Sequence, residues 1–357
     1  MFDKRDPYKE GSIWFYAPNK GAPIAFAILF AASGVIHAYQ SQRFRSWTVT
    51  GMLPWSAILF TVGFILRAIG AFGEWDNVPI YIASTVFLLA GPLVNPTHRD
   101  MGFANVIRPV YEGANFFILG RILYYIPYLS PIHPGRVFST FLGFLAFVEV
   151  LTANGAAQLA NTEATQRRRD IGDGLLKAAL ILQLVVMAGF VSLAVFFQVK
   201  CYRASLLTKK LKSVLAVLYC SCTLITIRTV FRTVEYFTAA GQHSWDDPND
   251  VDPIIRNEWF FWFFEVVIMY ANTTMLNIFH PMRFLPHSNK IYLAKDGVTE
   301  VEGPGFQDTR PWYVTFIDPF DIAGLISGRQ VKYWETDGSG QGNQTNTQKD
   351  VNSPCYA

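Results

Sequence analysis

Two apolar runs near the middle of the chain decide its fold. They read SVLAVLYCSCTLITIRTVFRTVEYFT at residues 213–238 and WFFWFFEVVIMYANTTMLNIFH at residues 259–280. Each run can cross a bilayer as one α-helix, because about 20 residues at a rise of about 1.5 Å cover the roughly 30 Å hydrocarbon core. Pro281 ends the second run, since proline cannot continue a helix. We therefore predict two membrane-spanning helices joined by a loop rich in aspartate.

Both runs carry ionisable residues, which lipid-facing helices avoid. In the first run, Arg228, Arg232 and Glu235 are four and three residues apart and share one helix face. At the second run, a polar residue recurs every seven positions. These residues are Glu258, Glu265 and Asn272. A charge at mid-membrane costs about 2.5–3.5 kcal/mol on insertion scales, so we expect both polar stripes to line the interior of a helix bundle.

The composition indicates an integral membrane protein. Of the 357 residues, 51% are apolar and 16% are charged, against about 25% charged residues in soluble domains. The net charge of +3 and the absence of a basic run with aromatics argue against nucleic-acid binding. Four cysteines and six scattered histidines contain no zinc or metalloprotease pattern, and no phosphate-binding loop is present. We predict that the chain is not an enzyme and uses no metal or cofactor.

Seven spans account for the apolar segments, which together form a membrane domain at 22–281. The predicted spans are 22–39, 53–72, 80–92 together with 110–127, 137–159, 175–199, 213–238 and 259–280. The two halves of the third span are separated by the polar residues 93–109, and the first half is too short to cross alone. We interpret 93–109 as an insertion into one helix. An unspliced intron is one hypothesis for it, and the sequence of the transcript tests that hypothesis.

The flanking segments and the loop charges predict the orientation. Residues 1–21 form a polar N-terminal tail, 282–333 an ordered cap, and 334–357 a disordered tail rich in Gly, Ser, Asn, Gln and Thr. Eleven Lys and Arg residues lie in loops on the predicted C-terminal side, against eight on the other. The positive-inside rule then predicts an outside N-terminus and a cytosolic C-terminus. A sugar on the sequon at Asn343 would invert this topology.

This topology places three ionisable groups at similar depth. Glu149 and Arg228 lie roughly 15 Å below the outer surface and Glu265 roughly 12 Å, at about 1.5 Å per residue. We predict a cluster in which Arg228 pairs with one or both carboxylates. The cluster is either a static ion pair that fixes helix register or a polar site on a substrate or proton path. Other candidate polar residues of the interior are Arg67, Glu112, Arg121 and Asn154.

Two polar residues and the aromatic run of the last span each allow two interpretations. Arg67 either snorkels to the interface or pairs inside the bundle. His37 is expected to be a hydrogen-bonded packing residue rather than a ligand. The aromatic residues of the last span either face lipid or lie along the apolar tail of a substrate. Their positions are Trp259, Phe260, Trp262 and Phe263.

The chain resembles the fungal RTA-like lipid-translocating exporters, which are seven-span proteins. The resemblance rests on the run from Arg228 to Glu235, on Glu258 and Glu265, and on Asn277-Ile-Phe-His280-Pro281. Gly120-Arg121, Glu149, and tail phrases such as Asp318-Pro-Phe-Asp also match. Two departures are the segment 93–109 and the lack of a carboxylate before Gly63-Phe64 that could partner Arg67.

The resemblance implies export or translocation of lipids or other amphipathic molecules, such as sphingoid long-chain bases, and resistance to toxic amphiphiles. The expected partners are membrane lipids and an amphipathic substrate, whose amine would suit Glu149 and Glu265. The plasma membrane is the expected location, with an endomembrane as the alternative. A receptor or sensor of membrane lipid stress that transports nothing is the competing hypothesis, since it also fits seven spans with a basic inner loop.

Overall fold

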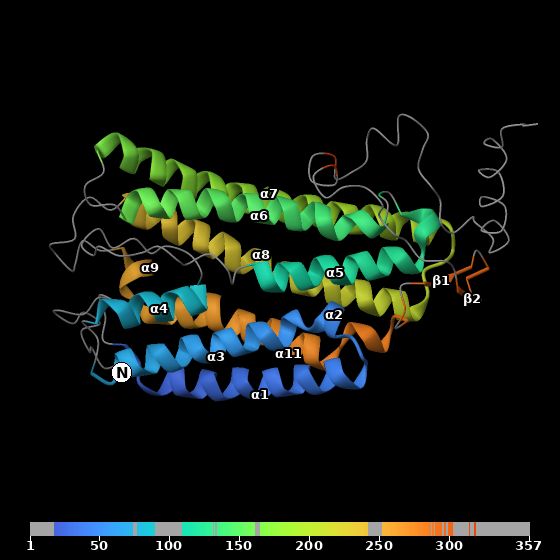
Figure 1. Cartoon of the computed structure of the whole chain (residues 1–357), viewed down its shortest axis with the longest axis horizontal. Coiled ribbons are helices and arrows are strands. Elements are labelled where there is room, and N and C mark those ends of the chain that lie inside the picture. The colour runs from blue at the N-terminus through green and yellow to red at the C-terminus, as the bar shows by residue number, and fades with distance from the viewer. Residues whose placement is uncertain are drawn as a thin grey trace, which may run out of the picture.

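Within the part of the chain that the structure describes, six helices are long and apolar enough to cross a membrane, so the protein is an all-α, multi-pass integral membrane protein (Figure 1). The computed structural model describes residues 18–73, 77–89, 109–130, 132, 134–160, 165–241, 252–286, 288, 290–294, 296–297, 299–302, 314 and 318. The five continuous helices are α1 (Gly21–Arg43), α3 (Met52–Ala71), α6 (Pro134–Ala160), α7 (Gln166–Arg203) and α8 (Lys209–Gly241). The sixth is the stretch Glu258–Arg283.

The sixth stretch is not a uniform α-helix. It begins with α10 (Glu258–Phe261), widens into the π-helical turn η2 (Trp262–Val267) and continues as α11 (Ile268–Ile278). The short helix α9 (Pro253–Arg256) precedes it, and the 3-10 turn η3 (Pro281–Arg283) follows. The helix therefore ends just before Pro281, as the sequence predicts, because a proline there cannot donate the next helical hydrogen bond.

The segments predicted as the third span form two short helices. They are α4 (Val78–Leu89) and α5 (Pro109–Tyr125), of 12 and 17 residues. Both pack on α3, and they occupy opposite halves of the length of the bundle (Figure 1). Of the predicted insertion 93–109, all but Pro109, the first residue of α5, lies outside the described residues. Two further short elements, α2 (Trp47–Thr50) and η1 (Pro127–Leu129), connect the longer helices.

Some helices extend well past the apolar segments that predicted them. Helix α7 has 38 residues and is about 57 Å long, far more than the roughly 30 Å hydrocarbon core. Its polar first turns remain helical because side chains one turn apart pair with each other. Gln166 donates to Asp170 over 2.9 Å, and Lys177 forms an ion pair with Asp173 at 2.6 Å. Hydropathy therefore located the membrane segment but not the ends of this helix.

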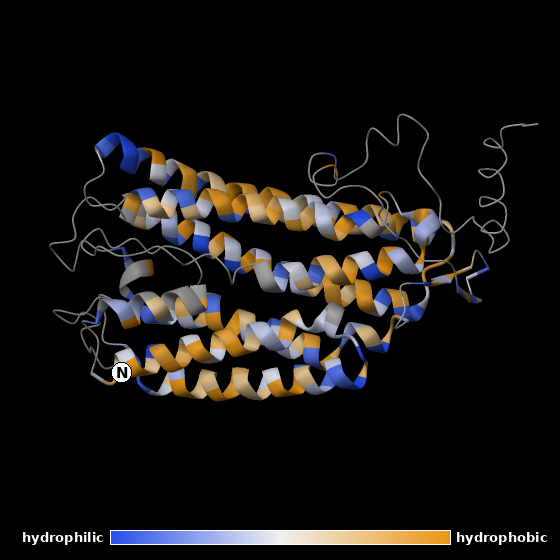
Figure 2. Cartoon of the chain, viewed as in Figure 1, coloured by the Kyte–Doolittle hydropathy of each residue, from blue (hydrophilic) through white to orange (hydrophobic). Residues whose placement is uncertain are grey.

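The outside of the bundle is apolar, and charged side chains lie within. Hydrophobic residues cover the middle of the long helices, and hydrophilic residues gather toward their ends (Figure 2). Val35 and Ile28 are 70% and 64% exposed, whereas Arg228 and Glu265 are 7% and 1% exposed. This distribution is the reverse of that in a soluble protein and matches a bundle that lipid surrounds.

A small hairpin lies at the end of the bundle where the last span terminates (Figure 1). Its strands are β1 (Ile291–Leu293) and β2 (Glu300–Glu302), which pair antiparallel. Two tyrosines attach it to the helical domain. Tyr125 donates to Glu300 and Tyr128 to the carbonyl of Ala294, each over 3.0 Å. Burial, with Cys201 and Asp296 nearby, raises the pKa of the Tyr128 phenol. This hairpin belongs to the predicted cap at 282–333; most of that segment beyond it, and the tail at 334–357, lie outside the described residues.

Candidate functional site

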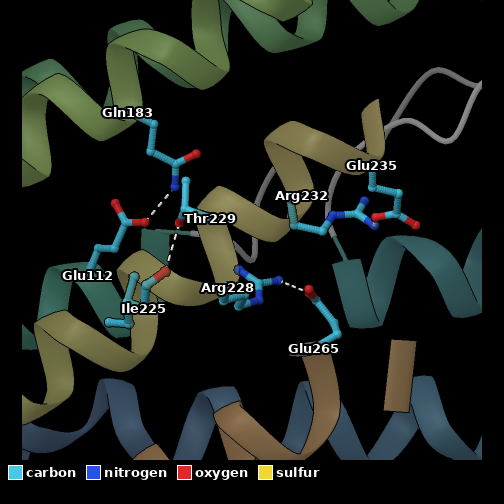
Figure 3. Close-up of polar contacts among 8 residues, drawn as sticks. All are labelled: Glu112, Gln183, Ile225, Arg228, Thr229, Arg232, Glu235 and Glu265. Carbon is cyan, nitrogen blue, oxygen red and sulfur yellow. Dashed lines mark hydrogen bonds and ion pairs between the residues drawn. The ribbon is translucent and has the colours of Figure 1, made fainter. Parts of the chain in front are cut away.

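A buried ion pair joins the two apolar runs that define the fold. The guanidinium group of Arg228 on α8 donates to the carboxylate of Glu265 in the π-helical turn η2 (Figure 3). Oε1 of Glu265 accepts this bond, and Oε2 accepts none from the residues that the structure describes. The predicted contact between these two residues is therefore present. The predicted grouping of Glu149 with them stays a prediction; Glu149 is buried on α6, whose main neighbours are α7 and α5.

Two more charges extend this pair along α8. Arg232 donates to Glu235 one turn further on, and both side chains are largely buried (Figure 3). Arg232 and Glu235 also interact electrostatically with Glu265, and Glu235 with Arg228. We call Arg228, Arg232, Glu235 and Glu265 the charged network. It holds two positive and two negative side chains, so the interior of the bundle is close to neutral there.

Arg67 pairs inside the bundle instead of snorkelling. Its Nη2 atom lies 2.9 Å from Oε1 of Glu258, and the guanidinium group stacks 4.2 Å from the ring of Phe261. The other oxygen of Glu258 accepts from the backbone N–H of Asn19 over 3.0 Å. The sequence indicated that Arg67 lacks a partner on its own helix, and the fold supplies one from the last span.

The remaining predicted polar residues separate into different environments. Glu112 of α5 accepts from Gln183 of α7 in the interior (Figure 3). Arg121 is buried near the hairpin end of α5 and donates to the carbonyl of Pro286. The expectation for Asn154 was wrong: its side chain is exposed on the outside of α6 and donates to the Val150 carbonyl of its own helix. A helical asparagine can satisfy itself in this way, so its polarity alone does not indicate which face is inside.

The π-helical turn explains why the seven-residue stripe of the last span does not act as one surface. Such a turn inserts an extra residue relative to an α-helix and re-aims the side chains before it relative to those after it. Glu258 accordingly reaches Arg67 on α3, whereas Glu265 reaches Arg228 on α8. The aromatic run around this turn gives no signal in the sequence from which a π-helix could be predicted. Such turns frequently occur at functional sites.

The aromatic residues of this span also divide between two environments. Trp259 and Phe263 are about half exposed, which fits contact with lipid. Trp262 instead packs inward, with its ring 5.5 Å from that of Phe26 on α1 and 6.0 Å from that of Phe64 on α3. Neither of the two predicted roles therefore applies to the whole run.

A set of uncharged polar residues is also buried between the helices. His37 of α1 forms a 3.0 Å hydrogen bond with Thr273 of α11, which confirms its expected role in packing. Asn115 of α5 donates to Ser221 of α8 over 3.0 Å. Asn272 is fully buried, and neither its oxygen nor its nitrogen has a hydrogen-bond partner among the described residues. Sequence reasoning missed Asn115 and Ser221, because single small polar residues in apolar helices give no periodic signal.

This fold and these contacts define a multi-pass membrane protein with a charged interior. The chain belongs to the family described as RTA1 like protein, whose model matches residues 54–288. No solved structure matches it.

Relatives in three fungi carry names that refer to lipids. The chain is 39% identical over 306 residues to the lipid-translocating exporter-like protein RTA1 of Leptosphaeria maculans, covering 83% of this chain and 56% of that protein. It is 31% identical over 315 residues to the protein of the same name from Ajellomyces capsulatus, covering 84% and 88%. The probable lipid transporter atnI of Emericella nidulans is 25% identical over 296 residues, covering 77% and 69%. The chain thus spans little more than half the length of the Leptosphaeria relative.

Proposed function

We propose that this chain is a transporter, not an enzyme, that moves lipids or other amphipathic molecules across the bilayer. Sphingoid long-chain bases are the substrates we favour, and resistance to toxic amphiphiles would follow from their export. The names of the three relatives support lipid transport. The observation that carries the proposal is the charged network, because ionisable side chains are rare inside membrane bundles and characteristically mark the pathways of polar substrates.

The network offers a cationic head group a defined place to bind. Oε2 of Glu265 accepts no hydrogen bond from the described part of the chain, although the residue is 1% exposed. An ammonium group that reaches this oxygen would compete with Arg228 for the carboxylate. Released from Glu265, Arg228 would remain close to Glu235, with which it already interacts. The exchange therefore keeps each buried charge near one of opposite sign, which limits its desolvation cost.

We further propose seven passes, an outside N-terminus and a cytosolic C-terminus, in the plasma membrane. The start of α1 and the hairpin lie at opposite ends of the bundle, which supports an odd number of passes (Figure 1). Helices α4 and α5 supply the additional pass if they act as two halves of one span. The exposed residues Arg203, Lys209 and Lys210 lie at the adjoining ends of α7 and α8, on the side that the positive-inside rule assigns to the cytosol.

Efflux of a labelled long-chain base tests the proposal. Cells would express the chain, an empty vector, or the double variant Arg228→Met/Glu265→Gln at matched membrane abundance. We expect the chain to speed efflux over the vector and the double variant to abolish that gain. The matched control is Lys177→Met/Asp173→Asn, which removes the same charges from a partly exposed pair and should leave efflux unchanged.

Two other outcomes have clear meanings. Full transport by the double variant would show that the Arg228–Glu265 pair is a static structural contact. A wild-type chain no faster than the vector would contradict transport and favour a sensor of membrane lipids, for which agonist-dependent signalling without flux is the readout. A variant lacking residues 93–109 belongs in the same assay, because efflux seen only with that variant would show that the segment prevents transport in the full chain.

A further inference from the structure

The interior of the bundle contains a second, uncharged polar site. Asn272 lies seven residues after Glu265, roughly 10 Å further along the helix. Helices α8 and α11 run antiparallel (Figure 1), and the Arg228–Glu265 contact sets their register. Counting seven residues back from Arg228 therefore brings Ser221 to the level of Asn272. Because Asn115 donates to Ser221, three helices contribute to this level. We call Asn115, Ser221 and Asn272 the amide layer.

The amide layer carries unmet hydrogen-bonding capacity. All three side chains are fully buried. Both polar atoms of Asn272 and the oxygen of Asn115 have no partner among the described residues. A buried polar atom left unsatisfied costs about 1–3 kcal/mol, so such atoms in proteins are nearly always met by water or a ligand. A static packing role does not explain Asn272, because leucine would fill a similar volume without this cost.

The open atoms define the chemistry of what they bind. They offer one donor group, the amide nitrogen of Asn272, and two acceptors, the oxygens of Asn272 and Asn115. None of the three side chains carries a charge. A hydroxyl group is the complement, because it donates one hydrogen bond and accepts others. We propose that the amide layer binds a hydroxyl group, either of a bound water molecule or of a substrate head group that has passed the charged network.

The head-group alternative rests on the proposed transport function. A head group that carries both an amine and a hydroxyl would then meet carboxylates first and amides second. The charged network would select for the positive charge, and the amide layer would reject chains that lack the hydroxyl. Selectivity for amino alcohols over simple amines is therefore the property that this layer would confer.

Binding to the purified full-length chain in detergent tests the head-group source. The probes are an eighteen-carbon 2-amino-1,3-diol and octadecylamine, which differ in the hydroxyl groups of the head. We expect wild type to bind the amino diol about tenfold more tightly, the value of one hydrogen bond at the upper end of its usual range. Asn272→Leu should bind both probes equally. The control Asn154→Leu makes the same change on the outer face of α6 and should keep the preference.

X-ray hydroxyl-radical footprinting tests the water source, because bound water generates radicals that oxidise neighbouring side chains. Met269 lies one turn before Asn272 and is 2% exposed, and Met187 on α7 is a comparably buried reference. If water occupies the layer, Met269 is oxidised faster than Met187 in wild type but not in Asn272→Leu. The inference is overturned if the wild-type chain shows neither a preference for the amino diol nor rapid oxidation of Met269. It is also overturned if the preference or the rapid oxidation persists in Asn272→Leu. Preferential binding without efflux would instead refute transport and leave the site intact.

Discussion

At the scale of single residues, Arg228 and Glu265 form an ion pair inside the bundle. Both side chains are buried, and each compensates the charge of the other. Removing one partner leaves the charged network with a net charge in a low-dielectric interior, whereas replacing both with neutral residues of similar volume keeps the network neutral. The single substitutions therefore test how much the pair contributes to stability, and the neutral double substitution tests its role in function.

We predict that Arg228→Met and Glu265→Gln each destabilise the purified protein strongly, by about 3–5 kcal/mol for a broken buried pair. The double variant should recover most of that loss. The measurement is the temperature at which half of the detergent-solubilised chain remains monodisperse. Additive losses in the double variant would show that the two residues do not act as a pair.

Arg67→Met should be milder than Arg228→Met. The side chain of its partner Glu258 is 15% exposed and also accepts from the backbone of Asn19, so that carboxylate keeps a hydrogen bond and some access to water. We expect a loss of about 1–2 kcal/mol, between the values for exposed and buried pairs. The same thermal assay compares the two variants directly, and equal losses would contradict the difference in environment.

At the scale of elements, glycines determine how closely helices α6 and α7 approach. A Cβ atom added at Gly172 of α7 would lie 2.9 Å from the backbone oxygen of Gly155 on α6, and one at Gly155 would lie 2.8 Å from that of Gly172. Backbone atoms cannot move aside as a flexible side chain can. The two helices therefore pack at a distance that only glycine at both positions permits.

We predict that Gly172→Ala destabilises the chain by about 1–3 kcal/mol, the usual range for overpacking. Gly189→Ala on the same helix is the matched control, because an added Cβ there meets nothing within 4 Å. It should stabilise the helix by roughly 0.5–1 kcal/mol through lower unfolded-state entropy and higher helix propensity. Thermal unfolding of the two variants should thus shift in opposite directions, and a shared direction would be evidence against the close approach.

At the scale of the whole molecule, the proposed orientation makes the two ends of α7 reachable from opposite sides of the membrane. Arg168 and Arg203 are both exposed, one near each end of this helix. We predict that a membrane-impermeant maleimide labels Arg168→Cys in intact cells, but labels Arg203→Cys only after permeabilisation. The unsubstituted chain is the background control for its native cysteines. The reverse pattern would place the N-terminus in the cytosol.

The number of passes has its own test. In a seven-pass chain, α4 and α5 carry the backbone from one side of the membrane to the other. Phe72→Cys should then react from outside and Ser130→Cys from the cytosol in the same labelling assay. Reaction of both from one side would mean that the two short helices do not form a complete span.

Composition and hydropathy alone predicted the class of protein and much of the membrane domain. Apolar runs long enough to span a bilayer predicted all six long helices, because the thickness of the hydrocarbon core imposes their minimum length. The same reasoning identified the contact between Arg228 and Glu265, since charges in such helices must find one another in the interior. It also placed the end of the last span at Pro281. These features depend on local composition and on the thickness of the bilayer.

Apart from the Arg228–Glu265 pair, the contacts between buried polar groups could be read only from the packed bundle. The pairing of Arg67 with Glu258 and the bond between Asn115 and Ser221 join residues more than 100 positions apart. The π-helical turn at Glu265 re-aims the last span, and Asn154 satisfies its side chain on the exposed side of α6. Helical periodicity assigns a residue to a face, but the helix that this face meets depends on packing among all the spans. The partners of buried polar groups are therefore a property of the assembled bundle, not of any one segment.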